Sequence, residues 1–109
     1  MDKDVFVGID LGTGGVRVLA VDASGRVVAA HSVAFPPSAP VDGRHEQDPE
    51  SWWTAACRAC RELVAELSRC GVDLQRLAAV AVDGTSGTIV LLDAAGAPVT
   101  PGLMYNDAR

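Results

Sequence analysis

One short segment of the sequence combines the residue types that bind phosphate. An acid, three glycines, a threonine and an arginine fall close together: Asp10, Gly12, Thr13, Gly14, Gly15 and Arg17. Backbone N–H groups unshielded by a Cβ atom can approach phosphoryl oxygens, while a hydroxyl and a guanidinium add donors and positive charge. The carboxylate of Asp10 can hold Mg²⁺ through water. The segment therefore predicts a phosphate-binding loop preceded by a metal-binding acid.

This loop differs from two common nucleotide-binding motifs. It lacks the Gly-Lys-Ser/Thr ending of the Walker loop, and it joins two predicted strands, unlike the strand-to-helix turn of dinucleotide-binding folds. The alternative that the local sequence leaves open is a glycine-rich hairpin turn in which Asp10 is incidental.

A second acid followed by small polar residues lies at positions 83–87. Asp83 can accept hydrogen bonds, and the hydroxyls of Thr85 and Ser86 can both donate and accept them, so the segment could bind a hydroxylated ligand. From these residues alone, an aspartate that forms a turn before Gly84 is the favoured interpretation.

The elements around these loops predict an α/β fold. Apolar, β-branched runs at 5–10, 16–21 and 26–33 indicate a three-strand meander with a turn at 22–25. A helix follows from the N-cap Asp48 and Pro49 to Gly71, with an apolar stripe that includes Cys70. The run 77–82 predicts a strand parallel to an earlier one and covered on both faces. A further hairpin is predicted around 93–96, on the same kind of turn as 22–25.

The connection through the helix fixes where the two acids should lie. Right-handed crossover geometry places the ends of parallel strands at one edge of a mixed sheet. We therefore expect Asp10 and Asp83 to flank one cleft.

Composition excludes several classes of protein. The net charge is -5 and the nine basic residues are scattered, which argues against a nucleic-acid partner. No apolar run approaches the ~20 residues of a membrane span, and the opening residues 1–4 lack the features of a secretory signal, so a cytoplasmic location is expected. Cys57, Cys60 and Cys70 have no second pair or histidine cluster, which favours reduced apolar residues over metal ligands.

Four segments, taken in order, resemble the FGGY family of carbohydrate kinases. They are 8–17 (GIDLGTGGVR), 46–53 (EQDPESWW), 82–88 (VDGTSGT) and 103–109 (LMYNDAR), and the resemblance covers essentially the whole chain. The first segment alone is similar to the whole superfamily of actin-like ATPases and sugar kinases. The resemblance implies a ribonuclease H-like (actin-like ATPase) fold, of which residues 1–109 form an incomplete N-terminal portion of the sugar-binding domain, without the nucleotide domain.

The resemblance also implies a function. ATP and Mg²⁺ would be the cofactors and a small-molecule sugar the partner. The resemblance shifts the interpretation of Asp83 from a turn toward sugar binding. The loop 83–88 is most similar to the D-ribulose kinase branch, also labelled xylulose-kinase-like, and the Arg-Glu pair of glycerol kinases is missing. A ketopentose is therefore expected, D-ribulose first and D-xylulose second. The alternative is a non-catalytic, actin-like ATP-binding or regulatory protein, against which the loop 83–88 argues.

The resemblance places further roles along the chain. Asn106 and Asp107 would lie near the sugar, although capping of a following helix is an equal alternative. The catalytic aspartate would lie beyond Arg109, so the chain alone is expected to be inactive. Trp52 and Trp53 are interpreted as packing residues, and His45 and Glu46 as exposed residues outside the site.

Overall fold

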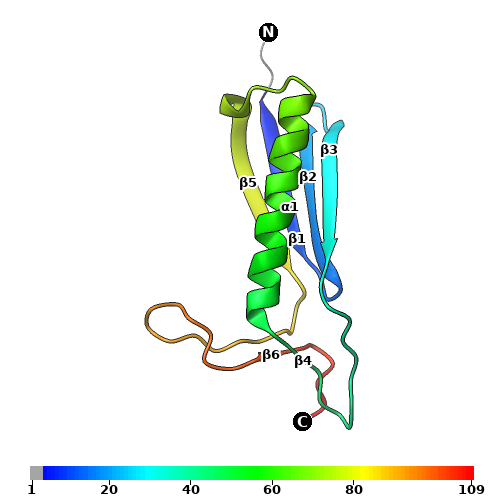
Figure 1. The fold of residues 1–109 in the computed structure, drawn as a ribbon, viewed down its shortest axis with the longest axis vertical. Coiled ribbons are helices and arrows are strands. Elements are labelled where there is room, and N and C mark those ends of the chain that lie inside the picture. Colours follow the sequence, from blue (N-terminus) through cyan, green and yellow to red (C-terminus); the bar gives the residue numbers. More distant parts are fainter. Residues whose placement is uncertain (1–3) are drawn as a thin grey trace.

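A mixed four-stranded sheet forms the body of the computed structural model, which describes residues 4–109. The order of the strands is β3-β2-β1-β5, and Figure 1 shows them side by side. The strands are β1 Val5–Leu11, β2 Gly15–Asp22, β3 Val27–Ala34 and β5 Leu77–Gly84. β1, β2 and β3 pair antiparallel and β5 pairs parallel to β1, which confirms the predicted α/β class, meander and crossover.

Helix α1, Pro49–Arg69, covers one face of the sheet (Figure 1). The side chain of Asp48 accepts a hydrogen bond from the Glu50 amide at 3.0 Å, as the predicted N-cap requires. At the other end Gly71 has a φ of 77°, and its amide donates to the Ser68 carbonyl at 3.1 Å. Glycine adopts this left-handed conformation without strain, so the predicted end of the helix is confirmed.

The core lies between α1 and the strands β1, β2 and β3. Alternate residues of the strands point toward the helix because successive side chains of a strand face opposite sides. The buried apolar residues of this layer are Val5, Val7, Val16, Val18, Ala20, Ala29, Ala55, Ala59, Leu63 and Leu67. The predicted stripe is wrong at its last member: Cys70 is exposed, since it lies at the C-cap where the helix has already left the sheet.

Strand β5 is not covered as predicted. Val80 and Val82 are each 61% exposed, because α1 packs over β2 and β3 and does not reach across to β5. The parallel pairing was predicted correctly, but the burial on both faces was not.

The two predicted Asp-to-Gly turns have the same hydrogen bonds. Asp22 accepts from the amides of Ser24 and Arg26 through its carboxylate, and Asp93 accepts in the same way from Ala95 and Ala97. The second turn closes a short hairpin, in which the Val99 amide donates to the Leu91 carbonyl at 2.9 Å.

The remaining elements are short. β4 Glu46–Gln47 pairs antiparallel with β6 Gly102–Leu103, and the 3-10 helix η1 Leu74–Arg76 leads into β5. In Figure 1 the β4–β6 pair and the C-terminus lie at the same end of the molecule, beyond the carboxyl ends of β1 and β5. Within residues 4–109, no helix has both the length and the apolar character of a transmembrane span. Residues 1–3, part of the opening segment used to predict location, lie outside the described residues.

Candidate phosphate and sugar site

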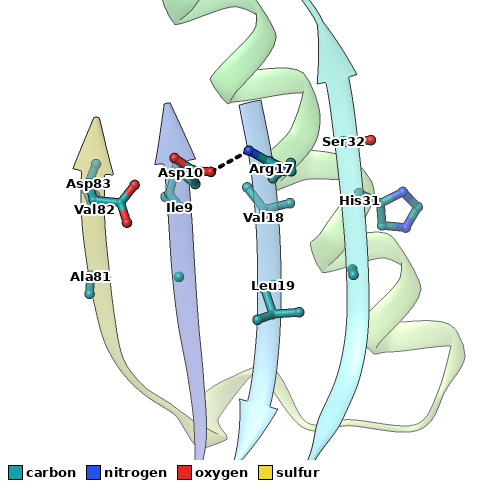
Figure 2. A pocket seen from close by; sticks show the side chains of 12 residues that line it. Ile9, Asp10, Arg17, Val18, Leu19, His31, Ser32, Ala81, Val82 and Asp83 are labelled. Carbon is teal, nitrogen blue, oxygen red and sulfur yellow. Dashed lines mark ion pairs between the residues drawn. The ribbon is translucent and has the colours of Figure 1, made fainter. Parts of the chain in front are cut away.

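The two acids predicted to share an edge lie directly opposite each other. Asp10 and Asp83 are Cα partners in the parallel register of β1 and β5. Both side chains line a pocket on the sheet face away from α1, and Figure 2 shows the Asp83 carboxylate directed toward β1. The predicted juxtaposition of the acids is therefore confirmed.

Arg17 faces this pair from β2, on the other side of β1. Its Nη2 atom lies 3.1 Å from Oδ2 of Asp10, an ion pair marked in Figure 2. Since Arg17 is paired with Asp10 in the cross-strand register, the meander itself brings the charges together. The guanidinium is 74% exposed, so this pair is open to solvent and weak as a source of stability.

The proximity of the carboxyl groups raises the pKa of Asp83 above its ordinary value. Hydrogen bonding with the Asp10 carboxyl group is the largest cause, the negative charge of Asp10 adds to it, and Arg17 partly offsets it. Two adjacent carboxylates repel each other, and a divalent cation between them relieves that repulsion.

The glycine-rich segment forms a tight turn between β1 and β2. The Gly12 amide donates to the Gly15 carbonyl at 2.9 Å, and the Phe35 amide donates to the Gly14 carbonyl at 2.9 Å. At Gly15 an added Cβ atom would lie 2.5 Å from the Val33 carbonyl oxygen of β3. Glycine is therefore required there by the close approach of β3.

Threonines connect the two acid-containing loops. The Thr85 amide donates to the Leu11 carbonyl at 3.1 Å, and the hydroxyls of Thr13 and Thr85 lie 3.4 Å apart. Ser86 follows on the exposed surface of the same loop. The structure thus brings the predicted phosphate-binding and sugar-binding loops into direct contact.

The matching segment 103–109 begins in β6, which pairs with β4, and continues beyond it. The Asp107 carboxylate accepts from the Arg109 guanidinium and from the His45 amide, and these bonds, led by that of Arg109, hold the pKa of Asp107 well below its usual range. Oδ1 of Asn106 lies 2.6 Å from Nδ1 of His45. Asn106 itself is exposed, and whether Asn106 and Asp107 contact sugar stays a prediction.

The prediction that His45 is an exposed loop residue is wrong. His45 is only 4% exposed, because its ring is enclosed by Asn106 on one side and Ser38 on the other. Sequence reasoning missed Ser38 and Gln47 altogether. The available signal was weak: Gln47 stands in the second matching segment, but its partner Thr13 lies 34 positions away.

The paired tryptophans have different surroundings. Trp52 packs against the core and donates from Nε1 to Oε1 of Gln47 at 2.8 Å, which confirms its interpretation as a packing residue. Trp53 is 68% exposed, so the same interpretation was wrong for it. The helix turns Trp53 about 100° away from the stripe that faces the sheet.

The donor set at the strand ends fits Mg²⁺ together with a polyphosphate. Mg²⁺ prefers oxygen ligands and commonly uses one or two carboxylates plus substrate phosphates and water. Asp10 would supply such a carboxylate, and a cation there would also weaken the repulsion between Asp10 and Asp83 that helps to raise the pKa of Asp83. Among the described residues no cluster of three or more His, Cys, Asp or Glu side chains forms a cage of its own, so phosphate and water would complete the coordination.

Comparison with known proteins agrees with this geometry. The family model described as the N-terminal domain of the FGGY family of carbohydrate kinases matches residues 5–109. A crystal structure of a xyloylose kinase from Brucella ovis superimposes with a TM-score of 0.85 at 30% identity, covering 96% of this chain and 22% of that one. The fold is that of the actin-like ATPases. The chain belongs to the FGGY family of carbohydrate kinases.

Curated relatives give the same assignment. The xylulose kinase of Streptomyces coelicolor is 42% identical over 106 residues, and that of Escherichia coli K12 is 38% identical over 105 residues. Each alignment covers 96% of this chain and 20% or 21% of the relative, so the chain spans about a fifth of the length of these relatives. The glycerol kinase of Plasmodium falciparum, solved with ADP, shares the fold with a TM-score of 0.80 at 18% identity.

Proposed function

We propose that this chain is the first part of the sugar-binding domain of an ATP-dependent kinase that phosphorylates a ketopentose. The observation that carries the proposal is the register of Asp10 and Asp83, which places two carboxylates beside Arg17 at the exit of a glycine-rich turn. Membership in the FGGY family supports carbohydrate as the acceptor.

Each group has a role in this proposal that its chemistry allows. Asp10 orients Mg²⁺, the turn 12–15 with the Thr13 hydroxyl cradles phosphates, and Arg17 neutralises negative charge. Bound Mg²⁺ supplies charge neutralisation at the phosphates of ATP. Phosphoryl transfer depends mainly on such positioning and charge stabilisation.

On the sugar side, the chain offers hydrogen-bonding groups along one edge. Asp83 accepts from sugar hydroxyls, and Thr85 and Ser86 donate and accept. Asn106 and Asp107 are the further candidates for contacts with the sugar. The base that takes the proton of the attacking hydroxyl is expected outside residues 1–109, so the chain alone would not catalyse transfer.

D-Xylulose is the first candidate for the sugar, and D-ribulose the second. Relatives that are 38% to 42% identical to this chain carry the name xylulose kinase, which supports D-xylulose. This reverses the order expected from the loop 83–88 alone, whose resemblance supports D-ribulose.

An ADP-release assay on the whole kinase, with D-xylulose, D-ribulose, ribitol, arabinitol and glycerol, tests the substrate. We expect kcat/KM to be highest for a ketopentose. Activity on glycerol alone would contradict the proposal, and ATP hydrolysis with no dependence on any sugar would favour the non-catalytic actin-like alternative.

The variant Asp10→Ala tests the assignment of the two loops. Loss of the metal-orienting carboxylate should lower kcat by about 10³-fold or more, while calorimetric sugar binding persists. Asp22→Asn, at the opposite end of β2, keeps the turn and should leave kcat unchanged. Loss of sugar binding with retained ATP hydrolysis in Asp10→Ala would mean that the loops have been assigned the wrong way round.

A further inference from the structure

A partly buried series of hydrogen bonds runs from the phosphate loop to the segment 103–109. The Gln47 amide donates from Nε2 to the Thr13 carbonyl at 2.9 Å and to the Ser38 hydroxyl at 2.8 Å. The Ser38 hydroxyl lies 2.9 Å from Nε2 of His45, whose Nδ1 lies 2.6 Å from Oδ1 of Asn106. Gln47 and His45 are 9% and 4% exposed, so these two members of the series are shielded from water, whereas Ser38 and Asn106 lie at the surface.

With Oδ1 of Asn106 facing Nδ1 of His45, as in the structure, the hydrogens of a neutral ring run in one direction along this series. Oδ1 of Asn106 is an acceptor, so Nδ1 of His45 must carry the hydrogen, and Nε2 must then accept. The Ser38 hydroxyl donates to Nε2 and accepts from Gln47, whose Oε1 accepts from Trp52. Every donor in the series meets an acceptor, as buried polar groups require.

The backbone of His45 is fixed independently of its ring. Its amide donates to Oδ2 of Asp107 at 2.9 Å, and its carbonyl accepts from the Met104 amide at 2.9 Å. The position of the ring is therefore held by the main chain on both sides, and Nδ1 is presented to Asn106 in a constant direction.

The hydrogen bond with His45 determines which group of the Asn106 side-chain amide faces solvent. An asparagine amide can rotate by half a turn and exchange donor for acceptor, and these two states offer opposite hydrogen bonding to a ligand. With Oδ1 held by His45, the Nδ2 group has no hydrogen bond within residues 4–109 and is left to donate outward.

We propose that His45 is a positioning residue for the sugar, because its Nδ1–H fixes the Asn106 amide with Nδ2 facing out as a donor to a sugar hydroxyl. The proposal rests on the proposed function, which places Asn106 at the sugar. His45 does not touch the substrate and acts only through Asn106.

Two substitutions separate this role from general support of the fold. In His45→Asn the side-chain amide occupies the place of Nδ1 and can still donate to Asn106, while the contact with Ser38 is lost. In His45→Gln the amide occupies the place of Nε2, so the Ser38 contact is kept and the donor to Asn106 is lost. The two variants are matched in polarity and each removes one hydrogen bond.

Steady-state kinetics of the whole kinase with its best ketopentose decide the question. We expect His45→Gln to raise the KM for sugar about tenfold, the loss of one well-oriented hydrogen bond, with kcat and the KM for ATP within about twofold of wild type. His45→Asn should restore the sugar KM to within about twofold of wild type. His45→Leu should behave like His45→Gln, and if it fails to fold, the Asn and Gln pair is sufficient.

Equal sugar KM values in the Asn and Gln variants would overturn the proposal, as would a uniform fall in kcat with all KM values unchanged. Failure of the proposed function looks different, because the wild-type kinase would then phosphorylate no ketopentose at all, and the role of His45 would fall with it.

Discussion

Asp10 and Asp83 are two carboxyl groups whose separation is set by the backbone. Because they are partners in a parallel register, neither can move away from the other without disturbing β1 or β5. This arrangement is unfavourable when both are ionised, and it is typical of sites that wait for a cation. Repulsion between the two ionised carboxylates therefore opposes folding at this point of the sheet.

Because the pKa of Asp83 is raised, the effect of this carboxyl group on stability depends on pH. The folded state holds the Asp83 proton more tightly than the unfolded state, whose value is about 3.8, so stability falls as pH rises from there through the raised pKa. Asp83→Asn keeps a hydrogen-bond donor for Asp10 and removes one charge. We expect the melting temperature of the variant to exceed that of wild type at pH 7, with the difference vanishing near pH 3.5.

Melting curves of both proteins between pH 3.5 and 7, without Mg²⁺, measure this difference. Added Mg²⁺ and ATP should reduce it at pH 7, since a cation held by Asp10 would relieve repulsion only in the wild type, where Asp83 is also ionised. A difference in melting temperature that does not vary with pH would show that the charge of Asp83 is already compensated.

The close approach of β2 and β3 determines which glycine of the phosphate turn is needed for the fold. Gly15 begins β2, and a Cβ atom there would collide with the Val33 carbonyl of β3, whereas a Cβ atom at Gly14 would meet nothing within 4 Å. Gly15→Ala should therefore destabilise the protein by about 2 kcal/mol, a typical cost of overpacking. Gly14→Ala, the matched control, should change stability by less than about 0.5 kcal/mol.

Urea unfolding of the two variants measures this contrast. Equal loss of stability in Gly14→Ala and Gly15→Ala would mean that β3 moves aside at little cost. In that case the requirement for glycine at position 15 would have to come from the ligand.

Local patterns were sufficient to predict the elements, and they failed where burial depends on distant parts of the chain. An apolar, β-branched run predicted β1, alternation predicted β2, and the caps Asp48 and Gly71 predicted both ends of α1. The facing acids followed from the handedness of the crossover. The exposure of Val80 depends on where α1 lies across the sheet, which no local pattern specifies.

In the candidate site, too, some residues could be predicted from local sequence and others could not. Asp10, Thr13 and Arg17 lie in one segment, so their chemistry could be predicted from the sequence. The burial of His45 arises from Ser38 and from Asn106, 61 positions away, and a histidine in a polar loop gives no sign of such partners. Residues that hold a site together across long separations are the part that required the structure.

At the scale of the whole molecule, the sheet is covered unevenly. α1 shields β2 and β3, while β5 lies at the edge of the sheet with its apolar side chains in solvent. In Figure 1 the upper part of β5 lies beside the helix. An exposed, apolar edge strand presents unpaired backbone groups and favours association with other strands.

We therefore expect the 109-residue chain on its own to self-associate through β5. Val80→Lys combined with Val82→Lys should prevent this, because a charged side chain cannot be buried without a partner, and lysine is a natural protection of edge strands. Burial of the two partly exposed valines would stabilise the association of wild-type chains. Loss of this burial should raise the dissociation constant of the double variant at least about tenfold.

Sedimentation equilibrium of the isolated chain measures the constant. Val27→Lys is the matched control, since Val27 is 55% exposed on β3 at the opposite edge of the same sheet. Because Val27→Lys also adds positive charge, an equal effect of this variant would assign the change to net charge. A monomeric wild-type chain would show that the exposed valines do not drive association. Weakening confined to the β5 variant would identify that edge as the surface through which the chains meet.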